Sequence, residues 1–144
     1  MKVLHLIGGG DIGGAKTHIL YLLKELSKHI DVKLVSLRPG VFADEAEALG
    51  IDVTVVKSRN IFADIKKVAD IIRDGGFDIV HSHGAKANIF SLAARRKSSP
   101  PTVTTVHSDY RLDYMHSWQK RLTIGLVNSI ALRFMHNYIA VSGN

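Results

Sequence analysis

The chain has 144 residues, of which 46% are hydrophobic and 22% are charged, and it contains no cysteine. This composition is typical of one globular domain with a buried core, and it excludes a disulfide framework and a thiolate metal site. Lysine and arginine outnumber aspartate and glutamate by 19 to 13, which gives a net charge of +6 and favours anionic partners. The charges are scattered and no nucleic-acid motif is visible, so we expect no nucleic acid among the partners. The lack of cysteine and of a recognisable signal peptide predicts a cytoplasmic location.

A glycine-rich stretch at 8–14, in which five of seven residues are glycine, lies between an apolar run at 3–7 and a helical pattern at 15–29. Glycine allows positive φ and a close approach of backbone to ligand, and a helix N-terminus offers free N–H groups to an anion. We therefore expect a phosphorylated ligand near Gly10, Gly13 and Gly14. A tight turn without a ligand is the alternative.

The hydrophobic pattern then alternates between strands and helices. We expect further strands at 32–37, 51–56, 77–83, 102–106 and 138–141, and further helices at 42–49, 61–72, 85–96 and 118–135. This alternation predicts a three-layer, Rossmann-like α/β domain over 1–144, with a parallel sheet and helices on both faces. The uncharged run at 122–132 is too short to span a bilayer, which needs about 20 residues. Because no helix closes the last strand, we expect this chain to be the front part of a longer protein.

In the common strand order 3-2-1-4-5-6, ligands bind outside the carboxyl ends of strands one and four. Three loops, 8–14, 81–86 and 107–110, would meet there. Beside the glycines, they bring together these candidate ligand contacts: His83, Lys86, His107, Ser108, Asp109 and Tyr110.

The histidines and Lys86 each allow two interpretations. His81 and His83 lie two apart on a strand end and point the same way, as two metal ligands would. No third ligand has motif spacing, so we favour one packed residue and one polar contact without metal, and we expect His5 in the core. Lys86 opposes the dipole of the helix it begins, which indicates an anionic partner unless the lysine is simply solvated. His107 is either a ligand contact or a histidine satisfied by backbone.

The glycine turn also fits two nucleotide motifs in part. Residues 8–13 match G-x-G-x-x-G, but the acidic residue expected at the end of the second strand is absent, since Asp31 stands at its beginning. Arg38 at that end would suit a 2′-phosphate, which leaves an NADP(H)-dependent oxidoreductase open, as well as a non-catalytic nucleotide-binding module. A P-loop is disfavoured because one residue separates Gly14 from Lys16.

Four short motifs, in order and at the ends of the expected strands, resemble the N-terminal domain of a family-4 (group 1) glycosyltransferase of GT-B fold. They are Gly13-Gly14-Ala15, His81-Ser82-His83-Gly84, Thr105-Val106-His107-Ser108 and Ala140-Val141-Ser142. The family often has a glutamate where this chain has Lys16, so the role of that glutamate does not carry over. Lys16 would instead make the mouth of the cleft more basic, and we count it among the candidate ligand contacts.

The resemblance implies an acceptor-side domain that faces a C-terminal donor-binding domain, absent from this chain, across the active site. It implies a retaining transfer of sugar from a nucleotide-sugar, in which His107 contacts the donor sugar, and a fragment that is inactive alone. It also implies that no metal or other cofactor is required. The N–H groups of Gly13 and Gly14 would stabilise the leaving diphosphate instead.

The loop at 110–116 would face the same cleft, where its aromatic rings and charged side chains suit a sugar or lipid-linked acceptor. Trp118, Lys120 and Arg121 follow it. An aromatic residue beside basic ones favours docking on an anionic membrane, so we expect the protein to be peripheral on such a surface.

Overall fold

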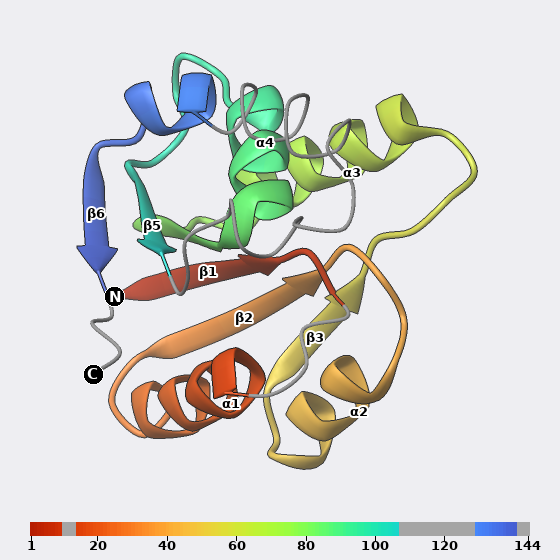
Figure 1. Cartoon of the computed structure of the whole chain (residues 1–144), viewed down its shortest axis with the longest axis vertical. Coiled ribbons are helices and arrows are strands. Elements are labelled where there is room, and N and C mark those ends of the chain that lie inside the picture. Colours follow the sequence, from red (N-terminus) through yellow and green to blue (C-terminus); the bar gives the residue numbers. More distant parts are fainter. Residues whose placement is uncertain (10–13, 107–128, 141–144) are drawn as a thin grey trace.

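The computed structural model describes residues 1–9, 14–106 and 129–140, and Figure 1 shows the whole chain. Its elements are β1 (Lys2–Ile7), α1 (Gly14–Leu26), β2 (Asp31–Ser36), α2 (Val41–Ala48), β3 (Asp52–Val55), α3 (Ile61–Asp74), β4 (Ile79–His83), α4 (Gly84–Ala94), β5 (Thr102–Val106) and β6 (Asn137–Ala140). Each coincides with a predicted element to within a few residues. Of the helix predicted at 118–135, residues 129–133 are helical and residues 118–128 lie outside the described part.

The six strands form one sheet in the order β3-β2-β1-β4-β5-β6, and every neighbouring pair is parallel. This confirms the predicted order and the Rossmann-like α/β class. The chain moves outward from β1 to β3 and then returns to place β4 on the other side of β1. The carboxyl ends of β1 and β4 therefore lie side by side at the point where the strand order reverses, which is where such sheets bind ligands.

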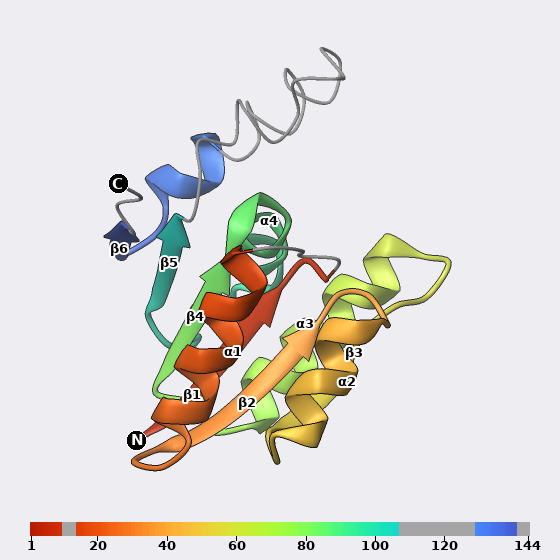
Figure 2. The ribbon, with the colours of Figure 1, turned by 60° about the horizontal axis from the view of Figure 1, so that its bottom comes forward.

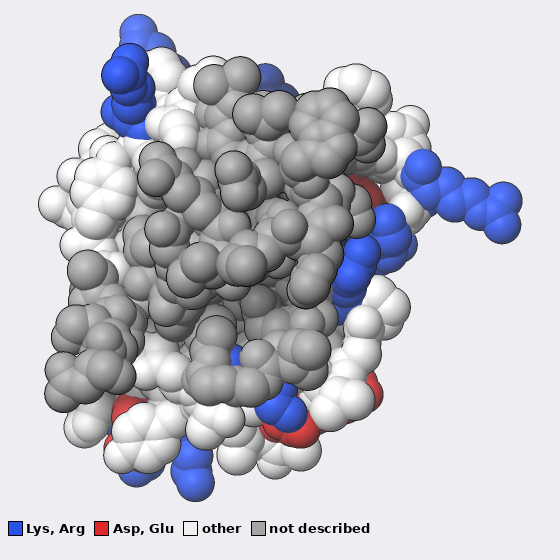
Figure 3. All heavy atoms as spheres, in the orientation of Figure 1, with Lys and Arg blue, Asp and Glu red and all other residues white. Residues whose placement is uncertain are grey.

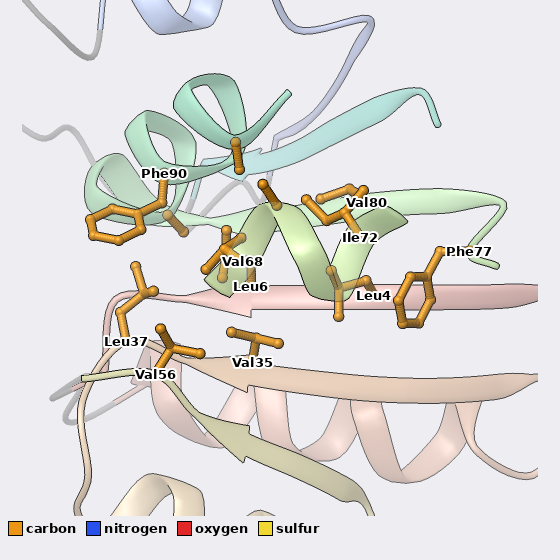
Figure 4. Packing of buried hydrophobic residues seen from close by; sticks show 13 residues of the cluster. Leu4, Leu6, Val35, Leu37, Val56, Val68, Ile72, Phe77, Val80 and Phe90 are labelled. Atoms are coloured by element: carbon orange, nitrogen blue, oxygen red, sulfur yellow. The ribbon is translucent and has the colours of Figure 1, made fainter. Parts of the chain in front are cut away.

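Helices cover both faces of this sheet, as Figure 2 shows for α1 and α2 on one side and α3 and α4 on the other. Alternate residues of a strand point to opposite faces, so β1 contributes to two separate cores. Leu4 and Leu6 belong to the core beneath α3 and α4, and Figure 4 shows Val68 and Ile72 of α3 facing them, with Phe90 of α4 nearer to Leu37. The second core lies beneath α1 and α2, and its buried members are Ile7, Ile19, Leu23, Leu34, Phe42, Ala46 and Ile51.

The turns around the helices follow from local chemistry. The side chain of Asn60 caps α3 by accepting a hydrogen bond from the N–H of Phe62 at 2.9 Å. Gly50, which follows α2, and Gly76, which follows α3, have positive φ as expected for residues that end helices. Among residues 1–9, 14–106 and 129–140, no helix is both long and apolar enough to cross a bilayer.

Candidate functional site

The loop after β1 meets the start of α4 at the carboxyl edge of the sheet, as the strand order predicted. Ile7 is paired with His83 in the register of β1 and β4. A Cβ built on Gly8 would lie 3.5 Å from the Cβ of Lys86. The third predicted loop and part of the first lie outside the described residues, and their predicted site residues are Gly10, Gly13, His107, Ser108, Asp109 and Tyr110.

The first turn of this loop is constrained by its own chain. Gly9 has φ +71°, and a Cβ at this position would stand 2.6 Å from the Cβ and 2.9 Å from the backbone N of Arg38. Glycine is therefore required at position 9, because the chain leaving β1 passes directly over the chain leaving β2. Beyond the turn, α1 begins at Gly14 and has no acidic residue in its first turn. Its N-terminus is thus not neutralised by a carboxylate from that turn.

Lys86 lies among other cations. Its Nζ donates to the carbonyl oxygen of Leu37 at 3.4 Å. Burial lowers the pKa of Lys86, and the neighbouring charges of Arg38 and Lys57 lower it further. The charge of Asp64 raises the pKa of Lys86, but this is the smallest of the four effects. The edge of the sheet near α3 and α4 therefore gathers positive charge, and the anionic partner of Lys86 remains a prediction.

Lys16 has a partner within the domain. Its Nζ donates to Oε1 of Glu45 at 2.7 Å, which joins α1 to α2. This ion pair offsets the positive charge that we expected Lys16 to add to the mouth of the cleft. Its predicted contact with substrate remains a prediction.

Three buried histidines form a cluster on one face of the sheet. His5 of β1 lies opposite His81 of β4, and all three rings, those of His5, His81 and His83, are buried with centroids 4.2 to 5.3 Å apart. A 3.0 Å hydrogen bond joins Nδ1 of His5 to Nε2 of His83, and Nε2 of His81 lies 2.6 Å from Oγ1 of Thr105. Because Leu4 and Leu6 face α3 and α4, this cluster lies on the opposite face of the sheet, which carries α1.

The position of His5 changes the interpretation of the other two histidines. We expected His5 in the core, and it is indeed fully buried, but it is also the hydrogen-bond partner of His83. Burial, with a smaller contribution from His81, lowers the pKa of His5 to about 3, so its ring is neutral at physiological pH. His83 is only 3% exposed. Its predicted ligand contact therefore remains a prediction.

The cluster is also the one group of possible metal ligands among the described residues, and its candidate ligand atoms lie within 4.8 Å of one another. Tetrahedral zinc with bonds of about 2.0 Å holds its ligand nitrogens roughly 3.3 Å apart. Separations of up to 4.8 Å between the histidine nitrogens are therefore wide for zinc. Ring nitrogens already bond within the cluster and to Thr105. The geometry favours a hydrogen-bonded cluster, although Nε2 of His5 has no hydrogen-bond partner among the described residues.

A second polar network lies on the α4 side of the same strands. Oδ1 of Asn88 accepts hydrogen bonds from the hydroxyls of Ser82 at 2.6 Å and Thr104 at 2.7 Å, and all three side chains are buried. The network joins α4 to β4 and β5 just below the carboxyl edge. No sequence pattern pointed to Asn88, whereas His5 could have been placed beside His81 from the strand order and the alternation of side chains.

A parallel sheet with this strand order and a glycine turn at its switch point defines a Rossmann-like α/β domain. The sequence model of Glycosyltransferase Family 4 matches residues 12–144. The chain therefore belongs to this family, which confirms the resemblance found in the sequence and decides against the oxidoreductase and P-loop interpretations. A comparison with curated protein sequences finds no match.

Solved structures of glycosyltransferases share the fold. Anabaena HepE in complex with UDP is 24% identical, and the match covers 99% of this chain and 38% of HepE with a TM-score of 0.74. The complex of HepE with UDP-glucose gives 25% identity, the same coverage and a TM-score of 0.73. Acinetobacter baumannii MurG is 12% identical, with a TM-score of 0.64 over all of this chain and 42% of MurG. The chain thus spans well under half the length of these proteins.

Proposed function

We propose that this chain is the acceptor-side domain of a retaining glycosyltransferase that moves a sugar from a nucleotide-sugar to a sugar or lipid-linked acceptor. The observation that carries the proposal is the family match over residues 12–144. The fold supports it, because the glycine turn, His83 and Lys86 lie at the carboxyl edge of the sheet. The complexes of HepE with UDP and UDP-glucose support a nucleotide-sugar as the class of donor.

In this proposal the leaving diphosphate lies at the start of α1. The N–H groups of Gly13 and Gly14 and the helix dipole stabilise its developing charge, so no bound metal is required. The absence of an acidic residue from the first turn of α1 is favourable to an anion there. His107 contacts the donor sugar and orients its reacting carbon. Lys86, together with the residues Ser108, Asp109 and Tyr110 that follow His107, contacts the substrates.

We also propose that a donor-binding domain completes the site and that this chain alone does not transfer sugar. The match covers only 38% of HepE, so most of HepE lies outside it, which is in keeping with a second domain. We place the protein in the cytoplasm, peripheral on a membrane that holds the acceptor. The positive net charge and the cysteine-free sequence support this location.

Saturation-transfer NMR on the purified chain tests the proposal. With UDP-glucose we expect weak binding in which saturation reaches the hexose protons more strongly than the uracil protons, because the other domain holds the nucleotide. His107→Ala should abolish the hexose signals, whereas His29→Ala, at an exposed position, should leave them unchanged. Tight binding of NADPH, or saturation confined to the nucleobase, would refute the acceptor-side assignment.

A further inference from the structure

The first turn of α3, just after the connection from β3, exposes two adjacent large apolar side chains. Ile61 is 55% exposed and Phe62 is 78% exposed, the highest value for any large hydrophobic side chain among the described residues. Val68, Ala69 and Ile72 of the same helix are buried in the core, so Ile61 and Phe62 lie on the same side of α3 but in its first turn, which extends beyond the core. Contiguous exposed apolar surface is a feature of interaction sites, and this pair forms a small patch of that kind.

Local hydrogen bonds fix the shape of this connection. The backbone N–H of Ser58 donates to Oδ1 of Asp64 at 2.7 Å, and the hydroxyl of Ser58 donates to the carbonyl oxygen of Asn60 at 2.9 Å. Asn60 in turn caps α3 through the N–H of Phe62. Asp64 is 6% exposed, which anchors the turn in the body of the domain. The two apolar side chains are therefore presented on a braced turn, which lowers the entropy lost when they bind.

Positive charges surround this apolar pair. Lys57 and Arg59 are exposed in the connection between β3 and α3. The charges of Lys57 and Arg38 both lower the pKa of Lys86. Figure 3 shows lysine and arginine atoms projecting on the side of the molecule where Figure 1 places this connection. Asp64, the acidic group that raises the pKa of Lys86 among the described residues, is buried and accepts a hydrogen bond from Ser58.

We propose that residues 57–62, the docking loop, bind the surface of an anionic membrane. Phe62 and Ile61 enter the boundary between headgroups and acyl chains, and Lys57 and Arg59 contact lipid phosphates. Two side chains are far too little apolar surface for a stable protein interface, which needs about 800 Å² on each partner. They are sufficient for reversible membrane binding when cations surround them.

The docking loop would bring the membrane close to the proposed acceptor site, and this part of the argument rests on the proposed function. Arg38, which like Lys57 lowers the pKa of Lys86, packs against Gly9 of the glycine turn. The membrane would then lie beside the carboxyl edge of the sheet. A lipid-linked acceptor could reach that edge without leaving the bilayer.

Co-sedimentation with vesicles tests the docking loop. We expect the protein to bind vesicles of phosphatidylcholine mixed with phosphatidylglycerol, to bind phosphatidylcholine alone weakly, and to be released by salt. The double variant Ile61→Ser/Phe62→Ser should weaken binding by about tenfold or more, and loss of each cation, as in Lys57→Gln, by about fivefold. Tyr21→Ser on α1, which alters a side chain that is 67% exposed, is the matched control and should bind as the parent does.

Equal binding to both kinds of vesicle, or equal loss in the Tyr21 variant, would overturn the proposal. So would a change from dimer to monomer in sedimentation equilibrium on replacing Phe62, without an effect on vesicle binding, since the loop would then join two copies of the chain. The assay contains no nucleotide-sugar. Failure of the NMR experiment therefore refutes the transferase assignment alone, and failure of vesicle binding refutes the docking loop alone.

Discussion

Acidification should destabilise this domain through the imidazole of His5. The ring is fully buried and its pKa falls from 6.5 to about 3, chiefly through burial and to a smaller extent through His81. Above pH 6.5 the ring is neutral in both the folded and the unfolded chain, so the full stability is present. As the pH falls from 6.5 towards 3, the unfolded chain takes up a proton that the folded chain does not bind. The free energy of unfolding therefore decreases over this window.

The size of this effect follows from the same pKa. Each pH unit below 6.5 removes about 1.4 kcal/mol from the free energy of unfolding, so His5 alone costs about 2 kcal/mol at about pH 5. A domain of this size has a total stability of about 5–15 kcal/mol, so the loss is readily measured. His5→Asn removes the titrating ring but keeps a polar atom near Nδ1, which bonds His83 in the parent.

Urea unfolding followed by circular dichroism, at several pH values from about 8 to about 5, measures this slope. The His5→Asn variant should be less stable than the parent at neutral pH, because its shorter side chain leaves a cavity. Its stability should then decline more slowly with acid, by about 1.4 kcal/mol less per pH unit. His29→Asn, at an exposed position, removes one histidine in the same way and should keep the slope of the parent. Parallel slopes for the parent and His5→Asn would refute the reasoning.

Three substitutions test the remaining structural conclusions by urea unfolding. Gly9→Ala should cost about 2 kcal/mol or more, because φ is +71° and the new methyl group meets a side chain 2.6 Å away; a neutral effect would show that the turn can relax. Asn88→Ala should cost about 2–3 kcal/mol, because the buried hydroxyls of Ser82 and Thr104 lose their shared acceptor. Replacing those hydroxyls as well should recover part of the loss. Asn60→Ala should cost about 1 kcal/mol through loss of the cap of α3, and no change would mean that water replaces it.

The fold was predictable from sequence because its signals are local and repeated. Apolar runs such as 3–7 mark strands buried on both faces, and the spacing of Ile61, Ile65, Val68 and Ile72 marks a helix with one packed face. Once strands and helices alternate, the right-handed crossover rule leaves few possible strand orders. The boundaries were less certain. The pattern did not show that α1 ends at Leu26 and that the residues just after it form a turn.

The candidate site was only partly predictable, because its side chains are set by contacts between distant segments. Lys86 was singled out by its conflict with the helix dipole, but its position near the charges of Arg38 and Lys57 depends on segments distant in the sequence. Lys16 was expected to face a ligand, and nothing local indicated that Glu45, on another helix, would pair with it. An ion pair between two helices depends on their packing, which a sequence pattern does not specify.

The polar groups of β4 show why the fold was easier to predict than the candidate site. Its residues alternate between faces, so Ser82 bonds Asn88 beneath α4 while His81 and His83 face the opposite side with His5. An apolar strand would have been simpler to bury at this central position, because buried polar groups are costly unless each finds a partner. The polar residues occupy the carboxyl half of the strand, next to the edge where this class of sheet binds ligands. The residues that reduce stability therefore lie next to the edge where a ligand site needs polar groups. The acid sensitivity expected of His5 is one measurable consequence.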